Sequence, residues 1–270
     1  MIKKILATAV MAAVLVFGLT GCGTADLEQT APADTPAVAP APTPTPPPTP
    51  TPVPEMPAPT PRPVSSTDAM DIPAGEAGIA KMHDFDYDGT PRTYMLYLPE
   101  DFGKNAPLVF VLHGYLGFAS RFMSITGMND AADKYHFGVV YPQGLSSRDS
   151  EFPGTHWNAD FTFTDVDDVG FLTALASHLQ ETYGFSGSET FAAGLSNGGF
   201  MCYTLAVRAP ETFRAVASVA GTMSKCTWDD RDLTEAPVPV LQIHGNFDGT
   251  VPIDGTMTEN GGWRGAPPMD

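Results

Sequence analysis

The chain has 270 residues, 43% of them hydrophobic, and a formal net charge of −17. Lysine and arginine together number 14 and form no basic patch, which argues against a nucleic-acid partner. The acidic balance mainly favours solubility. These averages cover three unlike segments, a leader, a linker and a folded domain, which have to be considered separately.

The N-terminus has the features of an export signal. Lys3 and Lys4 precede an apolar run over residues 5–19, which leads into small residues and Cys22. This pattern is similar to a bacterial lipoprotein signal peptide, and the run is short for a membrane-spanning helix. We expect residues 1–21 to be removed and Cys22 to carry a lipid that anchors the protein outside the cytoplasm, at the cell surface or facing the periplasm. The alternatives are an uncleaved anchor and an ordinary secretory signal.

Residues 22–64 are rich in alanine, proline and threonine, with an almost regular Thr-Pro alternation over residues 43–52. Proline fixes φ and removes the backbone donor, so this segment predicts an extended, disordered tether of about 3 Å per residue rather than a folded unit. Residues 65–270 then suffice for one α/β domain with a substantial core.

The first strands of this domain differ in character. Residues 92–98 alternate between apolar and polar side chains, which predicts a strand near a sheet edge, whereas residues 107–112 are continuously apolar, as in a parallel strand buried on both faces. The glycine-containing loop that follows can aim backbone N–H groups at a ligand, which makes the Tyr115 amide a candidate oxyanion donor. We interpret His113 as a structural residue of this loop.

Residues 122–135 predict a helix, and residues 137–142 predict the next buried strand. Residues 143–164 form a long polar stretch that contains Trp157, and loops of this length usually have a function. We treat Trp157 as a candidate substrate-binding residue. The alternative is that its ring pins the loop to the body of the domain.

Thr164 is a candidate N-cap for a helix that runs to about Tyr183, and four apolar residues share one face of it, at positions 169, 172, 175 and 179. Asp167 and Asp168 point in different directions on a helix and have no histidine at ligand spacing. We therefore expect no metal ion, and no other motif calls for a cofactor.

The sequence Gly194-Leu195-Ser196-Asn197-Gly198 stands between an apolar run and a helical run. In a G-x-S-x-G elbow the sharp turn between strand and helix exposes the serine oxygen, so Ser196 is the candidate nucleophile and the Asn197 amide the second oxyanion donor. The pentapeptide alone is weak, because a glycine-rich turn can be purely structural. Cys202 follows in the helix, where it is either a small buried residue or a disulfide partner of Cys226.

Residues 213–220 and 238–245 predict two further strands, and Asp248 follows the second. Strands thus alternate with helices, which predicts a doubly wound, mostly parallel sheet with active groups at the carboxyl ends of its strands. Asp248 comes after Ser196 in the chain and is a candidate to orient a catalytic histidine. A turn-forming aspartate before Gly249 is the plainer alternative.

Together these motifs resemble the polyhydroxybutyrate depolymerase and feruloyl esterase family of α/β-hydrolases. The resemblance covers nearly all of residues 85–254 and is carried by the following segments: 112–114, 141–144, 157–158, 167–171, 194–199 and 244–252. It implies an exported serine esterase, expected to be monomeric, that acts on feruloyl or acetyl esters of plant polysaccharide or on short hydroxyalkanoate esters. It assigns Ser196 as nucleophile and Asp248 as the acid of the triad.

One feature departs from the family pattern. The family's catalytic histidine lies some tens of residues beyond the aspartate, whereas the last histidine here is His244. Without a base a serine is a poor nucleophile. We expect the sequence to be truncated, with the histidine, the last strand and the last helix encoded beyond residue 270. The alternative is a catalytically dead hydrolase domain that binds polysaccharide or a partner protein.

Overall fold

The computed structural model describes residues 76–147, 153–161, 164–233, 236–255 and 268. The predicted signal peptide, Cys22 and the linker lie outside the described residues. None of the helices in the described ranges is long and apolar enough to cross a membrane. The elements in chain order are β1 (Lys81–Tyr87), β2 (Thr90–Tyr97), β3 (Leu108–Leu112), α2 (Ala119–Thr126), α3 (Met128–Tyr135), β4 (Gly138–Pro142), β5 (Ser146–Ser147), β6 (Gly154–Thr155), α4 (Asp168–Tyr183), β7 (Thr190–Leu195), α5 (Asn197–Arg208), β8 (Ala215–Val219), α6 (Lys225–Asp230), a 3₁₀ turn (Arg231–Leu233) and β9 (Val240–Ile243).

Within the described residues the main sheet has seven strands, in the order β1-β2-β4-β3-β7-β8-β9. The β1–β2 and β2–β4 pairs are antiparallel, and every pair from β4 to β9 is parallel. The predicted doubly wound, mostly parallel sheet is therefore confirmed. β3 and β7 lie side by side at its centre, so the loop after β3 and the turn after β7 meet at the same edge.

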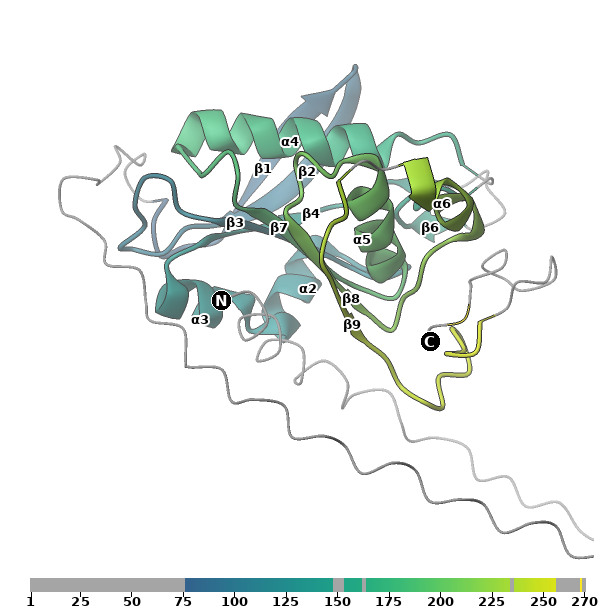
Figure 1. The fold of residues 1–270 in the computed structure, drawn as a ribbon. Helices are drawn as coiled ribbons and strands as arrows, with labels where there is room; N and C mark the ends of the chain where they lie inside the picture. Colours follow the sequence, from purple (N-terminus) through teal and green to yellow (C-terminus); the bar gives the residue numbers. More distant parts are fainter. Residues whose placement is uncertain (1–75, 148–152, 162–163, 234–235, 256–267, 269–270) are drawn as a thin grey trace, which may run out of the picture.

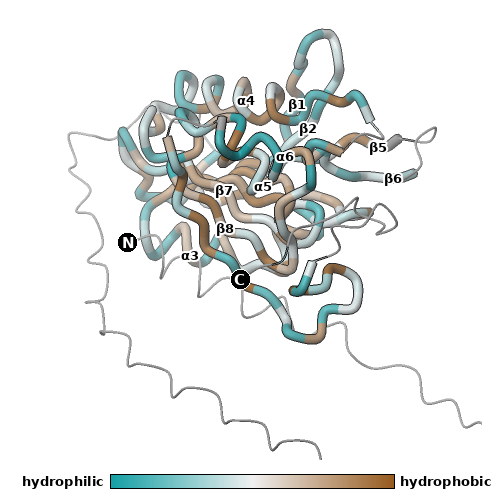
Figure 2. Tube along the Cα trace, turned by 45° about the vertical axis from the view of Figure 1, so that its right-hand side comes forward, coloured by the Kyte–Doolittle hydropathy of each residue, from teal (hydrophilic) through white to brown (hydrophobic). Residues whose placement is uncertain are grey.

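Helices cover both faces of the sheet, as Figure 1 shows. Leu108, Phe110 and Leu112 of β3 belong to the core beneath α4 and α5. Val109 and Val111 point the other way, into the core shared with α2 and α3. This two-sided burial is what the continuous apolar run predicts, and Figure 2 shows the hydrophobic strands β7 and β8 inside the molecule.

Two predicted helix features are corrected. The helix expected over residues 122–135 is two helices, because Gly127 has φ = 60°, a left-handed conformation that ends α2 and that glycine adopts easily. The cap of α4 is Asp167 and not Thr164, since the Asp167 side chain accepts a hydrogen bond from the Gly170 N–H. Thr164 instead bonds within the preceding loop, to the Val166 N–H.

The predicted long loop contains a short antiparallel strand pair, β5 with β6.

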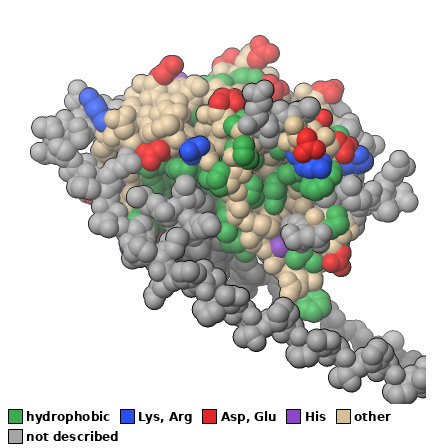
Figure 3. Space-filling model, viewed as in Figure 1, with side chains coloured by type: hydrophobic (Ala, Val, Ile, Leu, Met, Phe, Trp, Pro, Cys, Tyr) green, Lys and Arg blue, Asp and Glu red, His purple; other side chains and the backbone are tan. Residues whose placement is uncertain are grey.

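Cys202 and Cys226 are both free thiols, so they do not form the disulfide that was one of the two alternatives. Cys202 is buried, and burial raises the pKa of its thiol. These observations agree with the alternative in which Cys202 is a small buried residue. β9 is the edge strand of the sheet that the described residues form, and Val240 on it is 40% exposed. On the face seen in Figure 3, acidic side chains are spread along the upper edge and hydrophobic ones gather beneath them.

Candidate active site

Ser196 lies at a strained turn between β7 and α5. Its backbone has φ = 53° and ψ = −118°, a combination that a residue with a side chain rarely adopts and that persists where the surroundings impose it. The Ser196 N–H donates to the Val219 carbonyl at 2.7 Å, which fixes the turn to the end of β8. The structure therefore has the elbow geometry that the pentapeptide predicts.

The elbow is pressed against the end of β3. A Cβ atom at Gly198 would lie 2.4 Å from the Leu112 carbonyl oxygen and 2.7 Å from that of His113, so no side chain fits there. Gly114 in the following loop has more room, because a Cβ on it would stand 3.3 Å from the Leu195 carbonyl oxygen and 3.5 Å from the Ser196 Cβ. The loop after β3 therefore runs directly beside the candidate nucleophile.

The two candidate oxyanion donors flank this contact. Asn197 is the first residue of α5, and the first N–H groups of a helix have no acceptor within the helix. Tyr115 follows Gly114 in the loop, and its phenol donates to the Pro153 carbonyl at 2.6 Å. Leu116, the next residue, has φ = 59° and donates its N–H to the Thr155 carbonyl. Each candidate thus adjoins a residue with positive φ, since Ser196 precedes Asn197 and Leu116 follows Tyr115.

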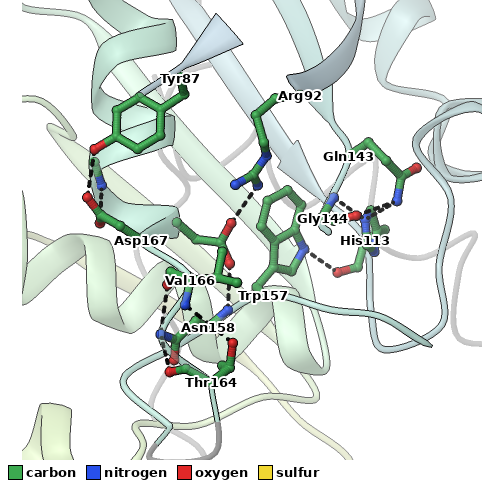
Figure 4. Close-up of polar contacts among 12 residues, drawn as sticks. Tyr87, Arg92, His113, Gln143, Gly144, Trp157, Asn158, Thr164, Val166 and Asp167 are labelled. Atoms are coloured by element: carbon green, nitrogen blue, oxygen red, sulfur yellow. Dashed lines mark hydrogen bonds and ion pairs between the residues drawn. The ribbon is translucent and has the colours of Figure 1, made fainter. Parts of the chain in front are cut away.

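His113 is a buried structural residue, as the sequence predicts. Its Nε2 accepts from the Gly144 N–H at 3.0 Å, so the ring proton is on Nδ1, which donates to the Gly114 carbonyl at 2.8 Å. Burial lowers the pKa of His113 to about 4, against an ordinary 6.5. The neutral ring cannot take a second proton without losing the Gly144 bond. It therefore shapes the loop beside Ser196 and is unsuited to act as its base (Figure 4).

Trp157 is completely buried, with 0% exposure. Its indole N–H donates to the His113 carbonyl at 2.9 Å, and its ring lies 4.9 Å from the His113 ring, centre to centre. A ring without exposed surface does not line a substrate pocket in this structure. Its position favours the alternative in which Trp157 pins the loop to the domain.

Asp248 follows β9, two strands along the sheet from Ser196 and at the same edge. Its Oδ1 accepts from the N–H groups of Thr250 and Val251, each at 2.9 Å, so it also forms the turn that the plainer alternative expected. Its Oδ2 lies 3.6 Å from Nε2 of His244. That histidine accepts from the Gln242 side-chain amide and donates to the Val251 carbonyl, so both its ring nitrogens are occupied.

A buried ion pair near the site was missed by the sequence analysis. Arg92 on β2 and Asp168 at the start of α4 are each 1% exposed and lie 2.5 Å apart, and the guanidinium also stacks on Phe171 at 3.7 Å. Burial raises the pKa of Asp168, and the Arg92 charge opposes that rise. A usable signal existed, because Asp168 falls on the apolar face of α4 with Phe171 and Leu175. A carboxylate on the apolar face of a helix indicates a buried partner of opposite charge or a hydrogen-bond donor.

Residues 92–229 match the family described as Esterase PHB depolymerase. This chain belongs to that esterase family. It is 32% identical over 182 residues to the putative esterase NocK of Nocardia uniformis subsp. tsuyamanensis, covering 63% of this chain and 49% of the relative. It is also 31% identical over 171 residues to the probable feruloyl esterase C of Aspergillus niger, covering 61% and 57%. The chain thus spans about half the length of the curated relatives it matches.

The fold of this family member is that of the α/β-hydrolases. A solved structure, the fluorophosphonate-binding serine hydrolase FphF of Staphylococcus aureus, superposes with a TM-score of 0.51 at 14% identity, covering 63% of this chain and 80% of that one. At this identity the likeness shows the fold alone. The expected α/β-hydrolase fold is therefore confirmed, whereas the roles of Ser196, Asp248, Tyr115 and Asn197 remain predictions.

Proposed function

We propose that this chain is the hydrolase domain of an exported serine esterase that cleaves carboxylic esters through an acyl-enzyme. The observation that carries the proposal is the position of Ser196, in a strained turn at the carboxyl end of a central parallel strand, with Gly114 of the loop after β3 beside it. This arrangement is suited to expose a nucleophile beside backbone donors. Membership of an esterase family supports the same chemistry.

In the proposed reaction the Ser196 hydroxyl attacks the ester carbonyl and loses its proton to a histidine. The amides of Tyr115 and Asn197 bind the oxyanion, and the alcohol leaves with the proton from that histidine. Water then attacks the acyl-enzyme, which releases the acid and restores the serine. The ring nitrogens of His113 and His244 are engaged elsewhere, so we propose that neither is the base and that Asp248 orients the histidine that is.

The proposed substrates are feruloyl or acetyl esters on plant polysaccharide and short hydroxyalkanoate esters. The printed name of the Aspergillus niger relative supports the feruloyl ester, and the family description supports the hydroxyalkanoate. The N-terminal features support export with a lipid on Cys22 and a proline-rich tether of residues 22–64. An anchored esterase of this kind would act on extracellular polymer.

The test is hydrolysis of p-nitrophenyl acetate and methyl ferulate by the full-length protein and by Ser196→Ala. The variant should lose at least about 10³-fold in kcat, because removing a triad member costs several orders of magnitude. Ser177→Ala, an exposed serine on α4, is the matched control and should keep full activity. Undiminished hydrolysis by Ser196→Ala would refute the assignment.

Two further results would separate the alternatives. An open reading frame that continues past the codon for Asp270 to a histidine codon would support the esterase, and sequencing the encoding DNA tests this. A full-length protein that binds xylan fragments saturably but cleaves no ester would instead support the catalytically dead binding domain.

A further inference from the structure

Trp157 connects the two backbone segments that flank Ser196. On one side its indole N–H donates to the His113 carbonyl, at the start of the loop that bears Tyr115. On the other side its main chain bonds the side chain of Asn197, the residue after the nucleophile. Figure 4 shows the indole reaching towards His113 from the loop after β6. One residue thus touches both segments that would supply the oxyanion donors.

The contact with Asn197 is reciprocal. The Trp157 N–H donates to Oδ1 of Asn197 at 2.7 Å, and Nδ2 of Asn197 donates to the Trp157 carbonyl at 2.9 Å. Asn197 is 1% exposed, so water does not replace either bond readily. A closed pair of this kind constrains both position and rotation of the first residue of α5. The identity of residue 197 therefore matters beyond its main-chain amide.

The loop that carries Trp157 is fastened at its far side to the core. The N–H of Asn158, the next residue, donates to Oδ2 of Asp168 at 2.7 Å, and Oδ1 of Asp168 pairs with Arg92. The Asn158 side chain also donates to the carbonyls of Thr164 and Val166. Because these bonds join the loop to β2 and α4, Trp157 cannot shift without breaking buried polar contacts.

We propose that Trp157 and the Asn197 side chain are positioning residues that set the spacing of the Tyr115 and Asn197 amides around the oxyanion. The proposal rests on the esterase function proposed above. Oxyanion donors act only when both lie at about 2.7–3.1 Å from the position the oxygen will occupy. A link that spans the two segments keeps that geometry fixed before substrate binds. Such a link therefore stabilises the transition state more than the ground state.

The experiment compares three variants of the full-length protein. Trp157→Phe removes the indole N–H and keeps an apolar ring. Asn197→Asp keeps the size and the acceptor oxygen but replaces the donor to the Trp157 carbonyl. Trp228→Phe is the matched control, since Trp228 lies on α6 and stacks on Arg231. Hydrogen–deuterium exchange over residues 113–118 and 195–200 is measured beside kcat and KM for p-nitrophenyl acetate.

In Trp157→Phe and Asn197→Asp we expect roughly five-fold faster exchange in these two segments, as for the loss of one buried hydrogen bond. We expect kcat to fall roughly ten- to a hundred-fold with KM within about two-fold, because displaced donors weaken only transition-state binding. The control should match the parent in both measurements.

Unchanged exchange in both variants would overturn the proposal, since the link would then not hold the segments. Faster exchange with an unchanged kcat would overturn the positioning role. A parent protein that hydrolyses no ester would overturn the esterase function and with it the catalytic part of the proposal. The exchange data would still report whether Trp157 joins the two segments, so the two failures are distinguishable.

Discussion

The titration of His113 should be visible in the stability of the fold. The ring is 1% exposed, and both its nitrogens are engaged, one as an acceptor from the Gly144 N–H. Burial penalises the charged form of the ring and lowers the pKa of His113 to about 4 from 6.5, and a second proton would also face the Gly144 donor. In the unfolded chain the same ring is free to protonate at its ordinary pKa.

The pH dependence of the unfolding free energy follows from this difference in pKa between the folded and unfolded states. Between pH 6.5 and pH 4 the unfolded state binds a proton that the folded state does not, so stability falls as the pH falls. The slope is about 1.4 kcal/mol per pH unit, which over this interval amounts to a loss on the order of 3 kcal/mol. Below about pH 4 both states are protonated and His113 adds no further loss.

Urea denaturation tests the predicted pH dependence of stability. It is measured for the parent and for His113→Asn at steps between pH 7 and pH 4. The variant should be less stable at pH 7, since it loses the bond from Gly144. Its stability should decline less on acidification, and the gap between the two proteins should narrow by on the order of 3 kcal/mol. Carboxylates titrate in both proteins and cancel in the difference. Parallel stability curves would refute the reasoning that His113 is neutral in the fold.

Two further predictions concern the contacts around the site, each measured by urea denaturation. Gly198→Ala should destabilise the protein by about 1–3 kcal/mol, because its Cβ would meet the Leu112 carbonyl at 2.4 Å. Gly187→Ala, where nothing lies within 4 Å, should be nearly neutral, and equal effects would contradict the steric argument. Arg92→Met should cost about 3–5 kcal/mol, because it leaves the buried Asp168 carboxylate without its partner, and adding Asp168→Asn should recover part of that loss. Strictly additive losses in this cycle would show that the pair does not interact.

The pattern of apolar residues predicted most of the sheet. The run at residues 108–112 is buried on both faces, and the elbow at Ser196 has the strained backbone that its glycines indicate. These features are local, because burial and turn geometry leave their mark on neighbouring residues. The sequence did not predict that the helix ends at Gly127, since an isolated glycine within a helical pattern is not sufficient to indicate a left-handed conformation.

The sequence by itself determined the alternation of strands and helices, the candidate nucleophile and the edge of the sheet at which it lies. Only the tertiary structure decided that Trp157 is buried and joins two loops, and that Arg92 meets Asp168, 76 residues away in the chain. The packing of β2, β3, α4 and α5 determines which residues become partners. The periodicity of side chains within one element does not indicate how far that element lies from a second one. Buried polar groups nevertheless need hydrogen-bond or charge partners. A polar residue on an apolar face is therefore the sequence feature that indicates such a contact.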